Sequence, residues 1–140
     1  MILLDTNVVS EPLKPSPDPA VVQWLNTQTP EDVYLPAIVA AELYYGWSIL
    51  PDGRRKRVSG DLVDRVVSQF EGRVVPFDLA AAVEYGRLMA TARSAGVGLP
   101  ILDGQIAAIA RAQGAALATR NVKHFEQTGI PLLNPWEGTR

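Results

Sequence analysis

Three carboxylates in this sequence stand apart from the other charged residues. Asp5, Glu42 and Asp103 each interrupt a long apolar stretch, and none has a Lys or Arg close by in the sequence. Carboxylates on a protein surface normally lie among other charges, because burying an unpaired charge is costly. The three acids must therefore be neutralised by something that the neighbouring sequence does not supply.

A divalent cation is the neutralising partner that this set of residues favours. Two carboxylates about 4 Å apart repel each other by about 4 kcal/mol at an effective dielectric constant of about 20, and a bound cation removes that penalty. Oxygen ligands suit Mg²⁺ or Mn²⁺, which retain water ligands and are often completed by a substrate phosphate. The chain has no Cys and one His, which excludes a thiolate metal site and a thiol nucleophile.

Each acid also has a purely structural interpretation, and the residues alone leave these alternatives open. Asp5 is placed to form an Asx turn after the apolar run Ile2–Leu4, and Asp103 is placed to cap a helix that follows a Gly- and Pro-containing loop. Glu42 falls in the middle of a helical pattern, where it has no capping role. Its structural alternative is an ion pair with a distant Arg.

Short apolar runs alternate with helical patterns along the chain. The strands are expected at residues 2–4, 32–36, 73–77, 115–118 and 130–133. The helices are expected at about 19–28, 37–50, 62–70, 78–96 and 103–114, with a short helix ending near 125. This order predicts a three-layer α/β/α sandwich around a central, mostly parallel sheet of about five strands, in one domain spanning residues 1–140. Residues at the carboxyl ends of such strands converge, so we expect Asp5 at this edge.

The composition narrows the class of protein further. Thirteen Lys and Arg against fifteen Asp and Glu give a net charge of -2, which excludes a protein that binds nucleic acid through bulk positive charge. The apolar opening at residues 1–4 is too short for a signal peptide, and no later apolar run is long enough to span a membrane. The sequence therefore predicts a soluble, cytoplasmic protein with no membrane contact.

Four blocks of residues occur in a recognisable order along the whole chain. They are Leu4-Asp5-Thr6-Asn7, Pro36–Leu43 followed by Gly46, residues 102–108, and residues 118–125. Together these blocks resemble the PIN-domain ribonucleases, specifically the VapC-type toxins of bacterial toxin-antitoxin systems. Any one block alone would be a weak signal.

The resemblance implies a metal-dependent endoribonuclease with a PIN-domain fold. Asp5, Glu42 and Asp103 would hold Mg²⁺ or Mn²⁺, directly or through water, and a metal-activated water would cleave RNA. The resemblance also implies a cognate antitoxin that inserts a segment toward the acidic pocket. It further implies a toxin homodimer and larger assemblies with the antitoxin.

The last block departs from the family pattern. Many family members carry a fourth acid there, whereas Asn121 and His124 occupy the corresponding positions in this chain. Asn121 is a candidate catalytic residue that ligates through its carbonyl or orients a water, and its alternative role is to cap the short helix. His124 lies next to Lys123 in a turn typical of a surface, which favours solvation or capping over general-base catalysis.

Five further side chains complete the candidate site. Thr6, Asn7 and Thr119 are expected to position the carboxylates or the substrate. Arg120 and Lys123 border the last block and are candidates for contacts to RNA phosphates.

Two features of the middle of the chain are ambiguous. The basic run Arg54–Arg57 either contacts phosphates or forms a solvated loop after a helix break. The aromatic side chains of Tyr44, Tyr45 and Trp47 share the helix of Glu42, and helical spacing cannot bury all three against one sheet. Some of them are therefore expected to meet a partner.

A second function from another class stays open. A non-catalytic PIN-like module, working in an antitoxin-led DNA-binding complex, would explain the missing fourth acid. A phosphotransfer receiver domain fits poorly, because the sequence lacks paired acids after the first strand. Nucleotide binding is weaker still, because Gly96-Val97-Gly98 lacks a third Gly and follows a predicted helix.

Overall fold

A five-stranded parallel sheet forms the centre of the molecule. The computed structural model describes residues 1–137. The strands are β1 (Ile2–Leu4), β2 (Val33–Pro36), β3 (Val74–Val75), β4 (Ala116–Ala118) and β5 (Leu132–Leu133). They lie in the order β3-β2-β1-β4-β5, and every pairing is parallel. The predicted five-stranded sheet is confirmed, and it is parallel throughout.

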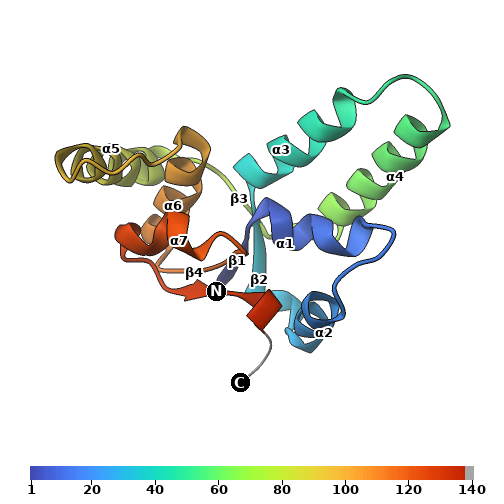
Figure 1. Ribbon diagram of the computed structural model, residues 1–140, viewed down its shortest axis with the longest axis horizontal. Helices are drawn as coiled ribbons and strands as arrows, with labels where there is room; N and C mark the ends of the chain where they lie inside the picture. Colours follow the sequence, from blue (N-terminus) through green and yellow to red (C-terminus); the bar gives the residue numbers. More distant parts are fainter. Residues whose placement is uncertain (138–140) are drawn as a thin grey trace.

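Helices cover both faces of this sheet. The α-helices are α1 (Thr6–Ser10), α2 (Pro19–Thr27), α3 (Ala37–Ser48), α4 (Arg54–Ser68), α5 (Leu79–Ser94), α6 (Ile101–Gln113) and α7 (Val122–Phe125), and the short 3-10 helices are η1 (Glu11–Leu13), η2 (Pro30–Asp32), η3 (Glu126–Thr128) and η4 (Pro135–Glu137). Figure 1 shows α1 to α4 on one side of the strands and α5 to α7 on the other. This confirms the predicted α/β/α sandwich. No helix in residues 1–137 is long and apolar enough to cross a membrane.

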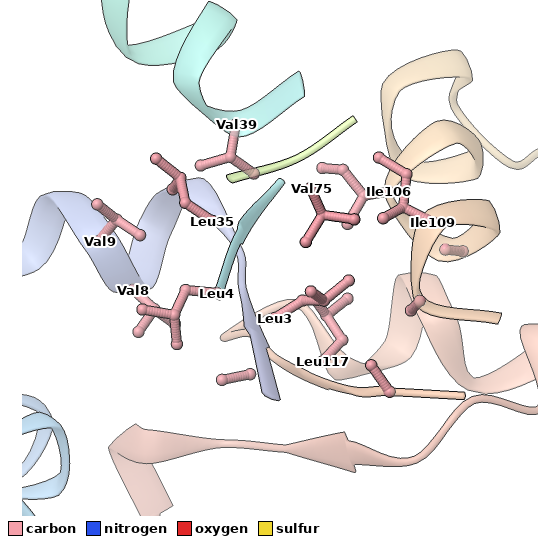
Figure 2. Packing of buried hydrophobic residues seen from close by; sticks show 14 of the residues in the cluster. Leu3, Leu4, Val8, Val9, Leu35, Val39, Val75, Ile106, Ile109 and Leu117 are labelled. Atoms are coloured by element: carbon pink, nitrogen blue, oxygen red, sulfur yellow. The ribbon is translucent and has the colours of Figure 1, made fainter. Parts of the chain in front are cut away.

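The strands are continuous apolar runs because both of their faces are buried. Leu4 packs with Val8 and Val9 of α1 on one side of the sheet, and Leu3 faces Ile106 and Ile109 of α6 on the other (Figure 2). All six side chains are at most 5% exposed. The core therefore fixes α1 and α6, the helices that begin beside Asp5 and Asp103, to opposite faces of β1.

Two helix boundaries differ from the predicted ones. The run Arg54–Arg57 forms the first turn of α4, so the loop interpretation of this run was wrong. The α6 helix begins at Ile101 after Pro100, which makes Asp103 a residue of the first turn rather than the predicted N-cap. Both predictions failed because the residues that begin these helices are polar or exposed, and the core-facing periodicity starts only later.

The helices α3 and α4 form a tightly packed antiparallel hairpin. Gly60 of α4 permits the close approach, because a Cβ atom at this position would lie 2.6 Å from Nε1 and 2.7 Å from Cε2 of Trp47. The Trp47 Nε1–H donates to the Lys56 carbonyl at 2.6 Å, and the Tyr44 hydroxyl lies 3.1 Å from an Asp64 carboxylate oxygen. Trp47 and Tyr44 therefore join the two helices, and the hairpin extends from the edge of the sheet (Figure 1).

Candidate functional site

The strand order reverses between β1 and β4, and the candidate site lies at this point. The chain connects β1 to β2 and β3 on one side, whereas β4 and β5 lie on the other side of β1. Such a reversal leaves a crevice at the carboxyl ends of the two strands, where loops diverge to opposite faces. Asp5 directly follows β1 and Thr119 directly follows β4, and the Asp5 N–H donates to the Ala118 carbonyl at 2.9 Å.

Asp5 is buried and held by hydrogen bonds on both carboxylate oxygens. The Thr6 N–H donates to Oδ1 at 2.8 Å, and the Thr119 hydroxyl donates to Oδ2 at 2.7 Å. Asn7 Nδ2 lies 3.5 Å from Oδ2. Burial raises the pKa of Asp5, the hydrogen bonds from Thr119 and Thr6 oppose this increase, and the charge of Asp103 adds to it. Asp5 therefore stands at the N-cap of α1, where its structural interpretation predicted an Asx turn, and the charge of Asp103 also acts on it.

Glu42 reaches the same site from α3 and is half-buried. Burial raises its pKa, the nearby Thr6 hydroxyl opposes the increase, and the charges of Asp5 and Asp103 add to it. Helix α3 contacts both α1 and α6, which explains why the three acids affect one another. Glu42 forms no ion pair with Lys or Arg in residues 1–137, so the alternative of a distant Arg partner is wrong.

Asp103 contacts the sole histidine of the chain. His124 Nδ1 on α7 lies 3.3 Å from Asp103 Oδ2, and the Asp103 side chain is 22% exposed. The His124 side chain is 55% exposed, as expected for a solvated residue, and its contact with Asp103 is a feature that the sequence did not predict. The sequence offered no signal for this contact, because the two residues lie on different helices and the packing of α6 against α7 brings them together.

The loop after β4 connects several of the expected supporting residues. The Thr119 hydroxyl, which donates to Asp5, also accepts the Asn121 N–H at 3.0 Å. The Asn7 carbonyl oxygen Oδ1 accepts the Arg120 N–H at 3.2 Å. Thr119 and Asn7 thus link the ends of β1 and β4, although their positions are 114 and 113 residues from their partners.

The other residues of the last block differ in their exposure and contacts. Asn121 is exposed and stands at the start of α7, but its side chain makes no capping hydrogen bond. The Arg120 guanidinium lies over the Trp136 ring, 5.1 Å from its centroid, and Lys123 is exposed on α7. The structure therefore places Asn121 and Lys123 on the open side of this loop and Arg120 against the aromatic ring.

A cavity lies elsewhere in the molecule. Its volume is about 520 Å³, and apolar side chains dominate its lining, among them Leu13, Val22, Leu25, Val66 and Phe70. None of the three acids lines it. Its lining contains no Asp, Glu or His side chain, so the carboxylates at the sheet edge stay the candidate site.

A comparison with protein-family models decides the family. Residues 2–130 match the PIN domain. This chain is a member of the PIN-domain family. The match covers all four sequence blocks and all three acids, so the resemblance noted from the sequence is confirmed.

Curated relatives of this PIN domain extend over almost its whole length. It is 45% identical over 138 residues to the VapC ribonuclease Y4jK of Sinorhizobium fredii, covering 98% of this chain and 99% of the relative. It is 41% identical over 137 residues to the toxin FitB of Neisseria gonorrhoeae, covering 97% and 99% of the two chains.

Solved structures agree with the described architecture. The crystal structure of FitAcB from Neisseria gonorrhoeae matches with a TM-score of 0.92 at 41% identity, covering 97% of this chain and 99% of that chain. A structure of FitAB bound to a DNA fragment matches with a TM-score of 0.95 at 39% identity, covering 100% and 99%. VapBC2 from Rickettsia felis, bound to a fragment of its promoter, matches with a TM-score of 0.82 at 27% identity, covering 96% and 98%.

PIN-domain ribonucleases use a divalent metal, and the donor set of this chain fits one. The donors are carboxylate oxygens; the charge of Asp103 raises the pKa of both Asp5 and Glu42, and the charge of Asp5 also raises that of Glu42. Within residues 1–137, no three acidic or His side chains form a ready-made coordination group. Mg²⁺ retains several water ligands and binds through one or two carboxylates, so this open arrangement suits it.

Proposed function

We propose that this PIN domain, as one unit over residues 1–140, is the ribonuclease toxin of a toxin-antitoxin pair. It hydrolyses RNA phosphodiester bonds, and Asp5, Glu42 and Asp103 hold Mg²⁺ or Mn²⁺. The proposal is supported by two observations: the charge of Asp103 on α6 acts on both Asp5, which follows β1, and Glu42 on α3, and none of the three acids has a Lys or Arg ion pair in the described residues. The relatives named as a VapC ribonuclease and as a toxin support it over nearly the full chain.

The chain's own residues preorganise the carboxylates. Thr6 and Thr119 each occupy one lone pair on a different oxygen of Asp5, which leaves the remaining lone pairs free for a cation or its water. Asn7 fixes the loop that follows β4, and His124 restrains Asp103 through Oδ2. These contacts keep the oxygen donors in place before the substrate arrives, which reduces the reorganisation that catalysis requires.

Substrate contacts in this proposal come from the last block. When bound, the divalent cation lowers the pKa of a coordinated water and offsets charge that develops on the phosphate. Asn121 orients a water or the phosphate through its exposed amide. Lys123 contacts a neighbouring phosphate, and Arg120 does so from a position that the Trp136 ring helps to set.

The partners follow from the named relatives. The solved structures of FitAB and VapBC2 are complexes bound to DNA fragments, and the fragment bound to VapBC2 comes from their promoter. We therefore assign to this chain a cognate antitoxin, an RNA substrate and self-association as a homodimer, which also joins larger assemblies with the antitoxin.

A direct experiment tests the nuclease assignment. The purified chain should cleave RNA with Mg²⁺, lose the activity in EDTA, and lose it again on Asp5→Asn or Asp103→Asn. Asp61→Asn is the matched control, because it removes an exposed carboxylate on α4, away from the sheet edge. Cleavage that persists in Asp103→Asn, or that falls equally in Asp61→Asn, would remove the proposed site.

One observation favours a second function. The fourth acidic position holds Asn121 and His124, so a non-catalytic module within an antitoxin-led DNA-binding complex is the alternative. Calorimetric titration with Mg²⁺ separates the two functions. If the chain binds Mg²⁺ and Glu42→Gln weakens that binding, the nuclease function is supported. If the chain binds no Mg²⁺, the binding module is supported.

A further inference from the structure

The far end of the α3–α4 hairpin carries arginines without counter-charges. Arg54, Arg55 and Arg57 are exposed, and none forms an ion pair within residues 1–137. Lys56, in the same run, differs. Its Nζ lies 3.1 Å from the Ser48 carbonyl and 3.5 Å from an Asp52 carboxylate oxygen, and it lies over the Trp47 ring. Lys56 therefore joins the two helices, whereas the three arginines face solvent.

The position of these arginines disfavours folding. They occupy the first turn of α4, where the helix dipole is positive, and that turn contains no acidic residue. Gly53 precedes the helix and supplies no side-chain cap. Arg54 and Arg57 are also like charges at i and i+3. Because the chain as a whole has a net charge of -2, this cluster is a local concentration of positive charge to which a polyanion would be attracted.

An exposed aromatic side chain lies between this cluster and Glu42. Tyr45 follows Glu42 by one helical turn, so the two share a face of α3, and Tyr45 is 68% exposed. Gly46 is the next residue, and a Cβ atom there would meet nothing within 4 Å. Glycine is unfavourable in the middle of a helix, and no packing inside the chain requires it here. On this face of α3 the half-buried Glu42 therefore lies one turn from an aromatic ring that is largely exposed.

Glu42, Tyr45 and the arginines follow one another from the sheet edge to the far end of the hairpin. Helix α3 leads away from the sheet edge, and α4 begins at the far end of the hairpin (Figure 1). From Glu42 to the end of α3 at Ser48 the axial rise is about 9 Å, at 1.5 Å per residue. A strand whose scissile phosphate lies at the carboxylates would pass Tyr45 within one turn and reach the arginines within a few nucleotides.

We propose that the α3–α4 hairpin binds the single-stranded RNA that flanks the cleaved bond, with a base stacked on Tyr45 and phosphates held by Arg54, Arg55 and Arg57. This inference rests on the proposed ribonuclease function. Proteins that bind single strands combine aromatic platforms with basic side chains in this way, because every base has a face that stacks and every nucleotide has a phosphate. The positive charge at the far end of the same hairpin favours RNA over a second protein surface.

The test measures binding separately from cleavage. A fluorescent oligouridylate is titrated with the full chain in EDTA at several salt concentrations, so no metal-dependent cleavage interferes. Arg54→Gln/Arg57→Gln should lower the slope of log affinity against log salt by about 1.4, since each phosphate contact on a single strand contributes about 0.7. Arg65→Gln/Arg93→Gln is the matched control, because it removes two exposed arginines from the last turns of α4 and α5. It should leave the slope unchanged.

A second variant pair tests the aromatic contact. Tyr45→Ala should weaken binding about tenfold at constant salt, and Tyr45→Phe should retain binding because the stacking ring is kept. Thermal unfolding of each variant checks that the fold is intact. Equal salt slopes for the two arginine double variants, or full binding by Tyr45→Ala, would overturn the proposal. The proposal would also be overturned if Tyr45→Ala changed the molecular mass measured by sedimentation but left the RNA affinity unchanged. That result would assign the Tyr45 face of α3 to contact with a second copy of the chain.

The outcomes separate this inference from the ribonuclease assignment. Cleavage that depends on Asp103 but is indifferent to the hairpin leaves the nuclease in place and removes the hairpin from RNA binding. RNA binding that depends on Tyr45 and the arginines, in a chain whose Asp103→Asn variant still cleaves, supports the hairpin contact and removes the carboxylate site.

Discussion

Replacement of Thr119 by Val should lower the free energy of unfolding, because it removes a hydrogen bond to Asp5. Thr119 is fully buried, and its hydroxyl donates to Asp5 Oδ2 at 2.7 Å while it accepts the Asn121 N–H at 3.0 Å. Valine has the same shape, so the change removes hydrogen bonds without opening a cavity. A hydrogen bond to a charged group contributes about 1.5–3 kcal/mol, and an orphaned donor adds about 1 kcal/mol. We expect the free energy of unfolding of the metal-free protein to fall by about 2–4 kcal/mol near neutral pH.

The effect of Thr119→Val should depend on pH in a defined direction. Burial raises the pKa of Asp5 in the folded chain, and the Thr119 hydrogen bond opposes this increase, so the variant raises the folded-state pKa further. Between the unfolded value of about 3.9 and the folded value, the folded state then binds more protons than the unfolded state. Stability therefore falls as the pH rises through this window. The deficit of the variant should be largest near neutrality and smaller near the unfolded pKa.

Urea unfolding, followed by the fluorescence of the three Trp residues, measures this effect in EDTA. Thr128→Val is the matched control, because Thr128 is also buried and its hydroxyl donates to the neutral carbonyl of Phe125. Its loss should be about 1 kcal/mol and independent of pH. Equal, pH-independent losses in the two variants would refute the argument that Thr119 acts by stabilising the charge of Asp5.

Two further predictions concern packing and the cation. Gly60→Ala should lower the midpoint of thermal unfolding, because the new Cβ atom would lie 2.6 Å from Trp47 Nε1. Gly86→Ala in α5 is the control, since its Cβ atom would meet nothing within 4 Å, and this change should be neutral or stabilising. Similar midpoints for the two variants would contradict the role of Gly60. Glu42→Gln should raise the thermal midpoint in EDTA at neutral pH, because it removes a carboxylate whose pKa is raised by burial and by two acidic neighbours. The same variant should show a smaller increase of the midpoint on addition of Mg²⁺ than the unchanged chain shows. A midpoint lowered in EDTA, with the Mg²⁺ effect intact, would contradict the mutual repulsion of the acids.

The order of elements and the candidate acids could be predicted from the sequence because both depend on local patterns. A run such as Ile2–Leu4 is recognisable as a strand because burial on both faces requires uninterrupted apolar residues. Glu42 stands out because a charge on an otherwise apolar helical stretch has no local reason to be there. The helix starts at Arg54 and Ile101 were missed, because exposed first turns carry no core-facing periodicity.

The sequence by itself determined which carboxylates lack a local partner and in what order the strands and helices follow. Only the tertiary structure decided which groups meet at the carboxyl edge of the sheet. His124 contacts Asp103 and Thr119 holds Asp5 because parallel pairing places β4 next to β1, although these strands are more than a hundred residues apart. Such contacts depend on strand order and helix packing, which arise from the burial of many side chains together and leave no signature at the positions that finally touch.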